Sequence, residues 1–271
     1  MAESAAVFNT WQGGDIMDLG LSGRVALMTG GARGIGLAHA RALGREGAVV
    51  ILNDLDAQAA GQAVDRLRAE GIQADFHVGD ATDPQVVEHT VTDVLSGHGR
   101  LDILVNNAGI GVKPAARVEE MPFEAWQRML HVHLDSTFLW SRAVVAPMRR
   151  NGFGRIINTS SMNFTGGGRP GVAHYSAAKA GIVGLTRTMA KEVGTYGITV
   201  NAIAPGYVAT ELIAQFSADM MERLQTQNPV GRLCLPEEVA ALAAFLCSGH
   251  AGFINGELIC MDGGRRDFYW G

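Results

Sequence analysis

Tyr175 and Lys179 stand four residues apart, in a segment that reads Tyr-Ser-Ala-Ala-Lys. Side chains with this spacing share one face of a helix, with Cβ atoms about 5–6 Å apart. Alcohol oxidation needs a base that takes the hydroxyl proton as hydride leaves, and ketone reduction needs the same group as an acid. Because an adjacent ammonium favours a phenolate, we expect Lys179 to lower the pKa of Tyr175 from its usual value of about 10 toward neutrality. The pair predicts an acid–base centre; a tyrosine beside a solvated lysine on an amphipathic helix is the purely structural alternative.

Such a centre also needs a hydroxyl donor that orients the carbonyl oxygen. A predicted strand upstream ends in Asn-Thr-Ser-Ser at 158–161, and Ser161 is the candidate for this role. A serine at a strand end is often only a local cap. The glycine-rich stretch 162–174 separates Ser161 from Tyr175. If this loop turns Ser160 toward the cleft instead, Ser160→Ala rather than Ser161→Ala should abolish activity.

A glycine-rich turn follows the first predicted strand and reads Thr-Gly-Gly-Ala-Arg-Gly-Ile-Gly over residues 29–36. Glycines in such a turn let backbone amides approach a pyrophosphate, and the amino terminus of the next helix favours its negative charge. The position between the first strand and the first helix favours dinucleotide binding over the alternative, a tight turn without a ligand.

Two charged residues bear on the choice of dinucleotide. Asp54 ends the second predicted strand, where a carboxylate can accept both ribose hydroxyls of NAD and would repel the extra phosphate of NADP. Arg33 favours the opposite choice, because a guanidinium can pair with a 2′-phosphate, although it can equally form a surface ion pair or contact the pyrophosphate. Desolvating two like charges costs more than forgoing one attraction, so the sequence predicts NAD.

These residues stand at the ends of short apolar runs that alternate with helical stretches. The apolar runs are continuous rather than alternating, which is typical of strands covered on both faces, and the segments between them are long enough for parallel crossovers. We therefore expect a doubly wound α/β fold with a seven-stranded parallel sheet in a single domain, residues 23–264. An N-terminal arm over 1–22 and a C-terminal tail over 265–271 are expected outside it. The predicted strands are 24–29, 48–53, 74–78, 101–105, 155–159, 198–203 and 257–260.

Composition narrows the classes of function. The chain has 271 residues, 47% of them apolar, which is ample for a buried core. A net charge of −5 without a Lys/Arg-dense run argues against nucleic-acid binding. The sequence lacks the pattern of a secretory signal or a membrane span, so a cytoplasmic protein without a membrane partner is expected. The three cysteines match no metal-binding or redox spacing, and no metal site is predicted.

Together these motifs resemble the single-domain branch of the short-chain dehydrogenase/reductase family over residues 21–262. Further carriers of the resemblance are Asp80, the Asn-Asn-Ala-Gly run at 106–109 and the Pro-Gly-Tyr-Val-Ala-Thr run at 205–210. The resemblance implies a Rossmann-like fold and an NAD-dependent oxidoreductase that interconverts a secondary alcohol and a ketone, with Tyr175 as general acid/base. It also implies a set of cofactor-binding residues: Gly30, Arg33, Gly34, Ile35, Gly36, Asp54, Asp80, Ala81, Asn106, Ala108, Gly109, Tyr175, Lys179, Pro205, Gly206, Val208 and Thr210.

Within this set, the resemblance places Asp80 near the adenine and Asn106 in a brace for the cofactor. Both roles have a structural alternative: Asn106 and its neighbours hold the sheet together, and Asp80 caps the next helix.

The main departure from the family is His133, at a position where relatives usually carry asparagine. The resemblance implies that this asparagine keeps a local helix irregularity, whose backbone carbonyl holds a water that links the catalytic lysine to solvent. His133 is a catalytic candidate because an imidazole, with a usual pKa of about 6.5, exchanges protons near neutrality. A tolerated replacement and an impaired turnover are the alternatives.

The region after Pro205 is expected to cover the substrate, either as a movable apolar lid or as ordinary helix core. The expected substrate is a small-to-medium ketone or secondary alcohol of limited charge. The substrate-binding candidates are Asn163, Phe164, His174, Tyr207, Leu212 and Phe216.

A homotetramer is expected by resemblance, paired through the small-sided helix that carries Tyr175. The aromatic tail 265–271 either reaches a neighbouring subunit or is disordered. An acyl-carrier-type 3-oxoacyl reductase is an alternative function, which Asp54 fits poorly because such enzymes usually use NADPH. A catalytically impaired NAD-binding regulatory protein is another. A methyltransferase on a related sheet would leave the Tyr175 helix unexplained.

Overall fold

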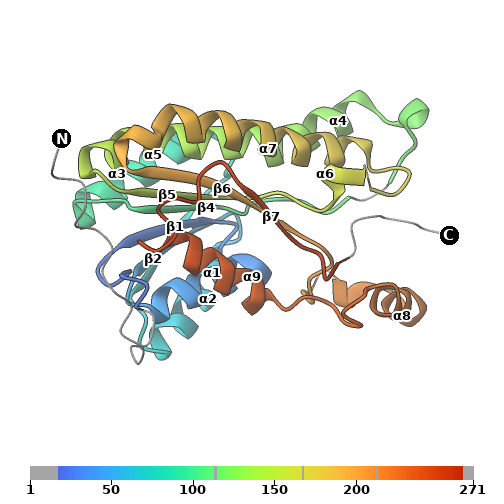
Figure 1. Ribbon diagram of the computed structural model, residues 1–271, viewed down its shortest axis with the longest axis horizontal. Coiled ribbons are helices and arrows are strands. Elements are labelled where there is room, and N and C mark those ends of the chain that lie inside the picture. Colours follow the sequence, from blue (N-terminus) through green and yellow to red (C-terminus); the bar gives the residue numbers. More distant parts are fainter. Residues whose placement is uncertain (1–17, 113–114, 167, 212, 265–271) are drawn as a thin grey trace, which may run out of the picture.

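The computed structural model describes residues 18–264, apart from 113–114, 167 and 212. Its centre is one parallel sheet of seven strands in the order β3-β2-β1-β4-β5-β6-β7, which lies between two layers of helices (Figure 1). The predicted doubly wound seven-stranded sheet is confirmed, with each strand within two residues of its expected bounds. The strands are β1 (Val25–Thr29), β2 (Val49–Asp54), β3 (Ala74–Val78), β4 (Ile103–Asn106), β5 (Gly154–Thr159), β6 (Ile198–Pro205) and β7 (Leu258–Met261).

Helices cover both faces of the sheet. One layer holds α1 (Gly34–Arg45), α2 (Ala57–Ala69) and α9 (Pro236–Cys247), and the other holds α3 (Pro84–His98), α5 (Ser136–Asn151) and α7 (Ala173–Val193) (Figure 1). The shorter elements are α4 (Phe123–Leu130), α6 (Asn163–Gly166), α8 (Ala218–Thr226), the 3-10 turns η1 (Val118–Glu120), η3 (Gly194–Tyr196) and η4 (Ile213–Gln215), and the π-helical turn η2 (His131–Asp135).

The continuous apolar runs form strands because both faces of the sheet are covered. All residues of β1 and β6 are buried. Along β2, Val50 and Leu52 belong to one apolar cluster, and Ile51 between them belongs to the cluster on the opposite face. The five inner strands β2, β1, β4, β5 and β6 therefore contribute to two cores, whereas the edge strands β3 and β7 contribute to one.

Buried polar side chains tie the middle of the sheet to the helices above it. Asn106 Nδ2, at the end of β4, donates to Ser141 Oγ on α5 (2.9 Å) and to Asn158 Oδ1 on β5 (2.8 Å). Asn158 Nδ2 donates to Thr186 Oγ1 on α7 (2.9 Å). Since unpaired buried polar groups are costly, this chain of bonds fixes the position of α7 over the end of β5.

The N-terminal arm was expected to extend to residue 22, but the part of it that the structure describes, 18–22, does not lie outside the fold. Leu21 is fully buried in an apolar cluster, and Asp18 O lies 2.8 Å from His250 Nε2. Residues 18–22 therefore pack on the domain. Residues 1–17 and the tail 265–271 lie outside the described residues.

Within the described residues, no helix combines the length and the apolar character needed to cross a membrane. In the same part of the chain, no group of three or more His, Cys, Asp or Glu side chains is arranged to hold a metal ion. Cys234, Cys247 and Cys260 form no disulfide within the described residues.

Candidate active site

A cleft lies at the carboxyl ends of the strands, where the strand order changes direction between β1 and β4. It consists of two adjoining cavities of about 690 Å³ and 320 Å³. The larger cavity borders the glycine turn and the ends of β2 and β3, and the smaller one borders the ends of β5 and β6 and α7. Open α/β sheets bind dinucleotides at such a switch point. The residues that line both cavities are Ile35, Asn107, Gly109, Ile110 and Thr210.

The glycine turn forms one wall of the larger cavity. A Cβ on Gly30 would lie 2.9 Å from Ala108 Cα, and one on Gly36 would collide with Gly30 O. The Arg33 side chain makes no capping hydrogen bond to α1, so the amides of its first turn are left for an anion. A turn whose glycines leave no room for a Cβ and an uncapped helix start fit the pyrophosphate of a dinucleotide.

Asp54 stands at the end of β2 and lines the larger cavity. Its Oδ2 accepts a hydrogen bond from Ala32 N (3.0 Å) and its Oδ1 accepts one from Asp56 N (3.1 Å). These bonds fix the orientation of the carboxylate. Arg33 Nη2 lies 2.6 Å from Asp56 Oδ2. Of the three roles considered for Arg33, the surface ion pair is the one that the structure contains.

The Asn-Asn-Ala-Gly run places Asn107, rather than Asn106, at the cleft. The Asn106 side chain is buried in the polar network of the sheet and is not among the residues that line the two cavities. Asn107 lines both cavities, and its Nδ2 donates to Gly30 O (3.1 Å). The Asn106 side chain therefore holds the sheet together, which is the structural alternative to a role in bracing the cofactor. Side chains alternate along a strand, so the residue after a buried strand end was the one to expect at the cleft.

Asp80 borders the far end of the larger cavity, as does Ala81. Asp80 Oδ1 accepts hydrogen bonds from Thr82 N and Thr82 Oγ1, both at 2.8 Å, and these bonds lower the pKa of the carboxyl. Asp80 thus closes a local turn, while the cap of α3 is Asp83. Further predicted cofactor residues that line the cleft are Gly34, Ala108, Pro205, Gly206 and Val208.

Tyr175, Ser161 and Lys179 meet at the smaller cavity. On α7, Lys179 Nζ lies 5.7 Å from the centre of the Tyr175 ring, and it donates to Thr159 O at the end of β5 (2.6 Å). The Ser161 hydroxyl is hydrogen bonded to the Tyr175 phenol. Ser160 instead donates to Lys179 O (2.9 Å), so Ser161 is the serine that meets the phenol.

The electrostatics of this group differ from the expectation. Burial raises the pKa of the Tyr175 phenol, and the hydrogen bond with Ser161 only partly offsets that effect. Burial also lowers the pKa of the Lys179 ammonium to about 7. The expected lowering of the Tyr175 pKa is therefore wrong for this structure, because desolvation of the phenol is the dominant effect on it.

His133 lies in the π-helical turn η2, so the helix irregularity expected at this position is present. Its ring packs edge-on against Tyr175, with centroids 5.2 Å apart. His133 Nε2 lies 3.1 Å from Ile110 O and 3.2 Å from Ile110 N, while Nδ1 finds no partner among the described residues. Burial, and after it the charge of Lys179, lowers the pKa of the imidazole to about 3. The ring is therefore neutral near pH 7, which argues against the proton-shuttle hypothesis.

Two of the predicted substrate residues, Asn163 and Tyr207, border the smaller cavity. Met162 and Ile213 border it as well, and Ile213 belongs to the region after Pro205 that was expected to cover the substrate. The wall thus combines polar and apolar side chains next to Tyr175.

Phe164, His174 and Phe216 are described but are not among the residues that line this cavity. His174 is buried in the first turn of α7, and burial lowers the pKa of its ring. Leu212 lies outside the described residues.

The segments that line both cavities lie within the part of the chain that matches known proteins. Residues 30–266 match the family model described as enoyl-(acyl carrier protein) reductase. The chain is 40% identical over 241 residues to the cis-4-hydroxycyclohexanecarboxylate dehydrogenase of Sinomonas cyclohexanicum, over 89% of this chain and 96% of that protein. It is 38% identical over 246 residues to a 3-oxoacyl-(acyl-carrier-protein) reductase of Vibrio cholerae, over 91% and 98%. A solved structure of a candidate gluconate dehydrogenase from Agrobacterium tumefaciens matches with a TM-score of 0.88 and 33% identity, over 94% and 100%.

Proposed function

The chain belongs to the short-chain dehydrogenase/reductase family of oxidoreductases, and on that premise we propose that it interconverts a secondary alcohol and a ketone with NAD(H). One observation carries the proposal: the Tyr175 phenol, hydrogen bonded to Ser161 and one helical turn from Lys179, borders the smaller cavity, which adjoins the larger cavity at the glycine turn. A phenol so placed reaches a substrate in the smaller cavity.

The larger cavity suits NAD. The turn at Gly30 and Gly36 would hold the pyrophosphate, and Asp54, oriented by two backbone amides, would accept the ribose hydroxyls. When bound, NAD supplies the hydride acceptor for oxidation, and NADH supplies the hydride for reduction.

Tyr175 acts as the acid in reduction and as the base in oxidation. Burial favours the protonated phenol, which is the form that donates a proton to the oxygen of a ketone as hydride arrives. The Ser161 hydroxyl stabilises the phenolate, which takes the proton of an alcohol. Since the pKa of Tyr175 is raised, oxidation should increase with alkaline pH.

Two neighbours position this phenol. Lys179, anchored to Thr159 O, brings a positive charge that varies near neutrality because its pKa is about 7. His133, with Nε2 at the backbone of Ile110, supports both the Tyr175 ring and the loop that lines the cleft. We assign His133 a positioning role.

The smaller cavity suits a compact substrate with both polar and apolar parts. Asn163 and Tyr207 offer polar groups, and Met162 and Ile213 offer apolar contact. The Sinomonas relative is named for a cyclic secondary alcohol, so cyclohexanols are the first compounds to try.

A 3-oxoacyl thioester reductase is the second candidate function. The family model and the Vibrio relative favour it. In that case a 3-oxoacyl thioester should be reduced faster than any simple ketone, and NADPH should serve as well as NADH.

The test is turnover by the wild type and by Tyr175→Phe, followed through the absorbance of the reduced nicotinamide. NAD and NADP are compared across a panel of secondary alcohols at mildly alkaline pH. We expect turnover with NAD and at least one alcohol, and a loss of about 10²–10⁴-fold in Tyr175→Phe. Equal turnover by the two proteins, or a preference for NADP, would contradict the proposal. NADH binding by Tyr175→Phe verifies that the variant is folded.

The proposed assembly is a homotetramer that pairs through α7. The outward side of this helix carries Ala180 and Gly184, and nothing lies within 4 Å of a Cβ built on Gly184. Small side chains there let a second copy of the helix approach closely.

A further inference from the structure

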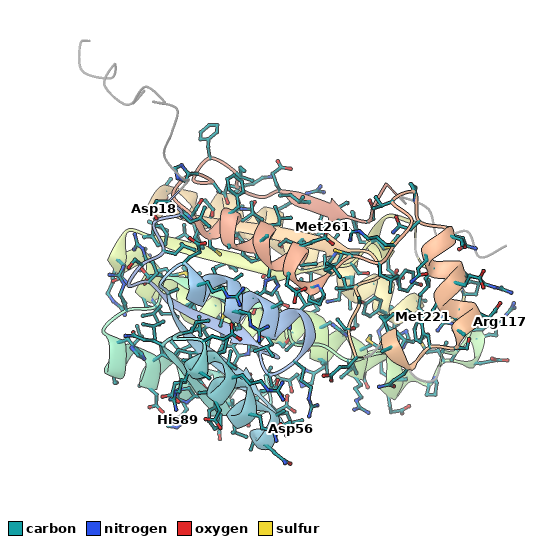
Figure 2. All side chains as sticks on the ribbon, turned by 90° about the horizontal axis from the view of Figure 1, so that it is seen from below. Asp18, Asp56, His89, Arg117, Met221 and Met261 are labelled. Atoms are coloured by element: carbon teal, nitrogen blue, oxygen red, sulfur yellow. The ribbon has the colours of Figure 1, made fainter. Side chains whose placement is uncertain are left out.

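Arg33 and Asp56 form an ion pair beside the larger cavity, which Arg33 lines and Asp56 does not. Arg33, in the glycine turn, lines this cavity, and its Nη2 lies 2.6 Å from Asp56 Oδ2. Asp56 stands just before α2, at the labelled position in Figure 2. The two side chains come from loops that follow β1 and β2.

Asp54 explains why these side chains meet. Its two carboxylate oxygens accept the backbone amides of Ala32 and Asp56, so the residue before Arg33 and the residue that pairs with it are fixed on either side of one carboxylate. The Arg33–Asp56 pair therefore lies at the same end of the cleft as Asp54. An extra phosphate on the ribose would have to enter that end.

Asp56 also has a second bond that restricts it. Its Oδ1 accepts from Ala59 N (3.0 Å) as the cap of α2, which leaves Oδ2 for Arg33. Because the cap fixes the carboxylate, Arg33 is paired with a stationary partner rather than with a flexible side chain.

Resting on the proposed use of NAD, we propose that Asp56 is a second determinant of the choice between NAD and NADP, because it engages the guanidinium that would otherwise pair with a 2′-phosphate. Asp54 disfavours that phosphate directly, by like charge. Asp56 does so indirectly, by occupying Arg33. A guanidinium in the glycine turn is thereby made compatible with NAD.

The experiment measures the dissociation constants of NADH and NADPH at equilibrium, which does not depend on turnover. Asp56→Asn is the central variant, because asparagine caps a helix as well as aspartate does, while its neutral amide releases Arg33. We expect the ratio of the NADPH to the NADH dissociation constant to fall about two- to fivefold, the size of an exposed charge contact. The fall should shrink as salt is added.

Two further proteins separate the pairing from a general change in charge. Asp65→Asn removes one exposed carboxylate from the same helix and should leave the ratio unchanged. In Arg33→Gln/Asp56→Asn the fall should disappear, because no guanidinium remains to bind the phosphate. Thermal unfolding of each variant verifies that α2 is intact.

The outcomes distinguish this inference from the proposed function. If the wild type prefers NADH and the ratio in Asp56→Asn is unchanged, or falls equally without Arg33, the role of Asp56 is overturned while the use of NAD stands. If the wild type binds neither dinucleotide, or prefers NADPH, the proposed function and this inference are both refuted.

Discussion

Replacing Lys179 with methionine measures how much the burial of this amine beside Tyr175 lowers the free energy of unfolding. Burial lowers the pKa of the ammonium from 10.5 to about 7. Between these two values the unfolded chain binds more protons than the folded protein, so the free energy of unfolding rises with pH in this window. With these pKa values, the linkage relation gives a gain of about 2 kcal/mol between pH 7 and pH 9.

The Lys179→Met variant should lack this gain. At pH 7 the same relation assigns the buried amine a cost of about 4 kcal/mol, part of which the variant recovers. The recovery is incomplete because Thr159 O loses its hydrogen-bond donor. We also expect kcat/KM to fall at least about 10²-fold, so the variant trades activity for stability.

The assay is urea unfolding, followed by circular dichroism at pH 7, 8 and 9. Lys191→Met is the matched control, because Lys191 lies exposed on the same helix. Its pH dependence should parallel that of the wild type. If Lys179→Met also parallels the wild type from pH 7 to pH 9, the lysine is not deprotonated by burial and the reasoning is refuted.

Four further predictions concern single residues. Ser161→Ala should lower kcat by about 10²-fold, and Ser160→Ala much less, since only Ser161 bonds to the phenol; steady-state rates compare them. His133→Asn should leave the pH profile of kcat/KM unchanged above pH 5, because the pKa of the imidazole is about 3; a shifted limb would restore the shuttle hypothesis. His39 is buried on α1 with a pKa of about 4, below its unfolded value of 6.5, so its contribution to stability is lost as pH falls; the wild type should lose about 2 kcal/mol more than His39→Leu between pH 7 and pH 5, by urea unfolding. Gly184→Arg should dissociate the proposed tetramer, as seen in mass photometry; an unchanged mass would exclude α7 as the interface.

The sheet was predictable because its inner strands are buried on both faces. Continuous apolar runs such as 48–53 are rare outside a covered parallel sheet, and each one appears as a strand. The site was predictable where spacing alone decides position. Tyr175 and Lys179 share a helix face, and the glycine turn precedes α1.

The remaining features depend on packing that spacing does not encode. Burial raises the pKa of Tyr175, and the spacing between Tyr175 and Lys179 says nothing of that burial. The partner of Arg33 lies 23 residues away, and the two meet only because β1 and β2 are neighbours in the sheet. In the same way, nothing local to His133 shows that its ring reaches the backbone of Ile110.

The reversal of strand order between β1 and β4 also separates the tasks of the site along the gene. In the proposed function, the loops after β1 and β2 set the choice of nucleotide, whereas the proposed reacting hydroxyls and the amine come from β5 onward. A genetic crossover placed between α5 and β5 would therefore join the coenzyme preference of one parent to the substrate range of another. Such chimeras offer a route by which new alcohols can be accommodated without re-evolving the nucleotide half.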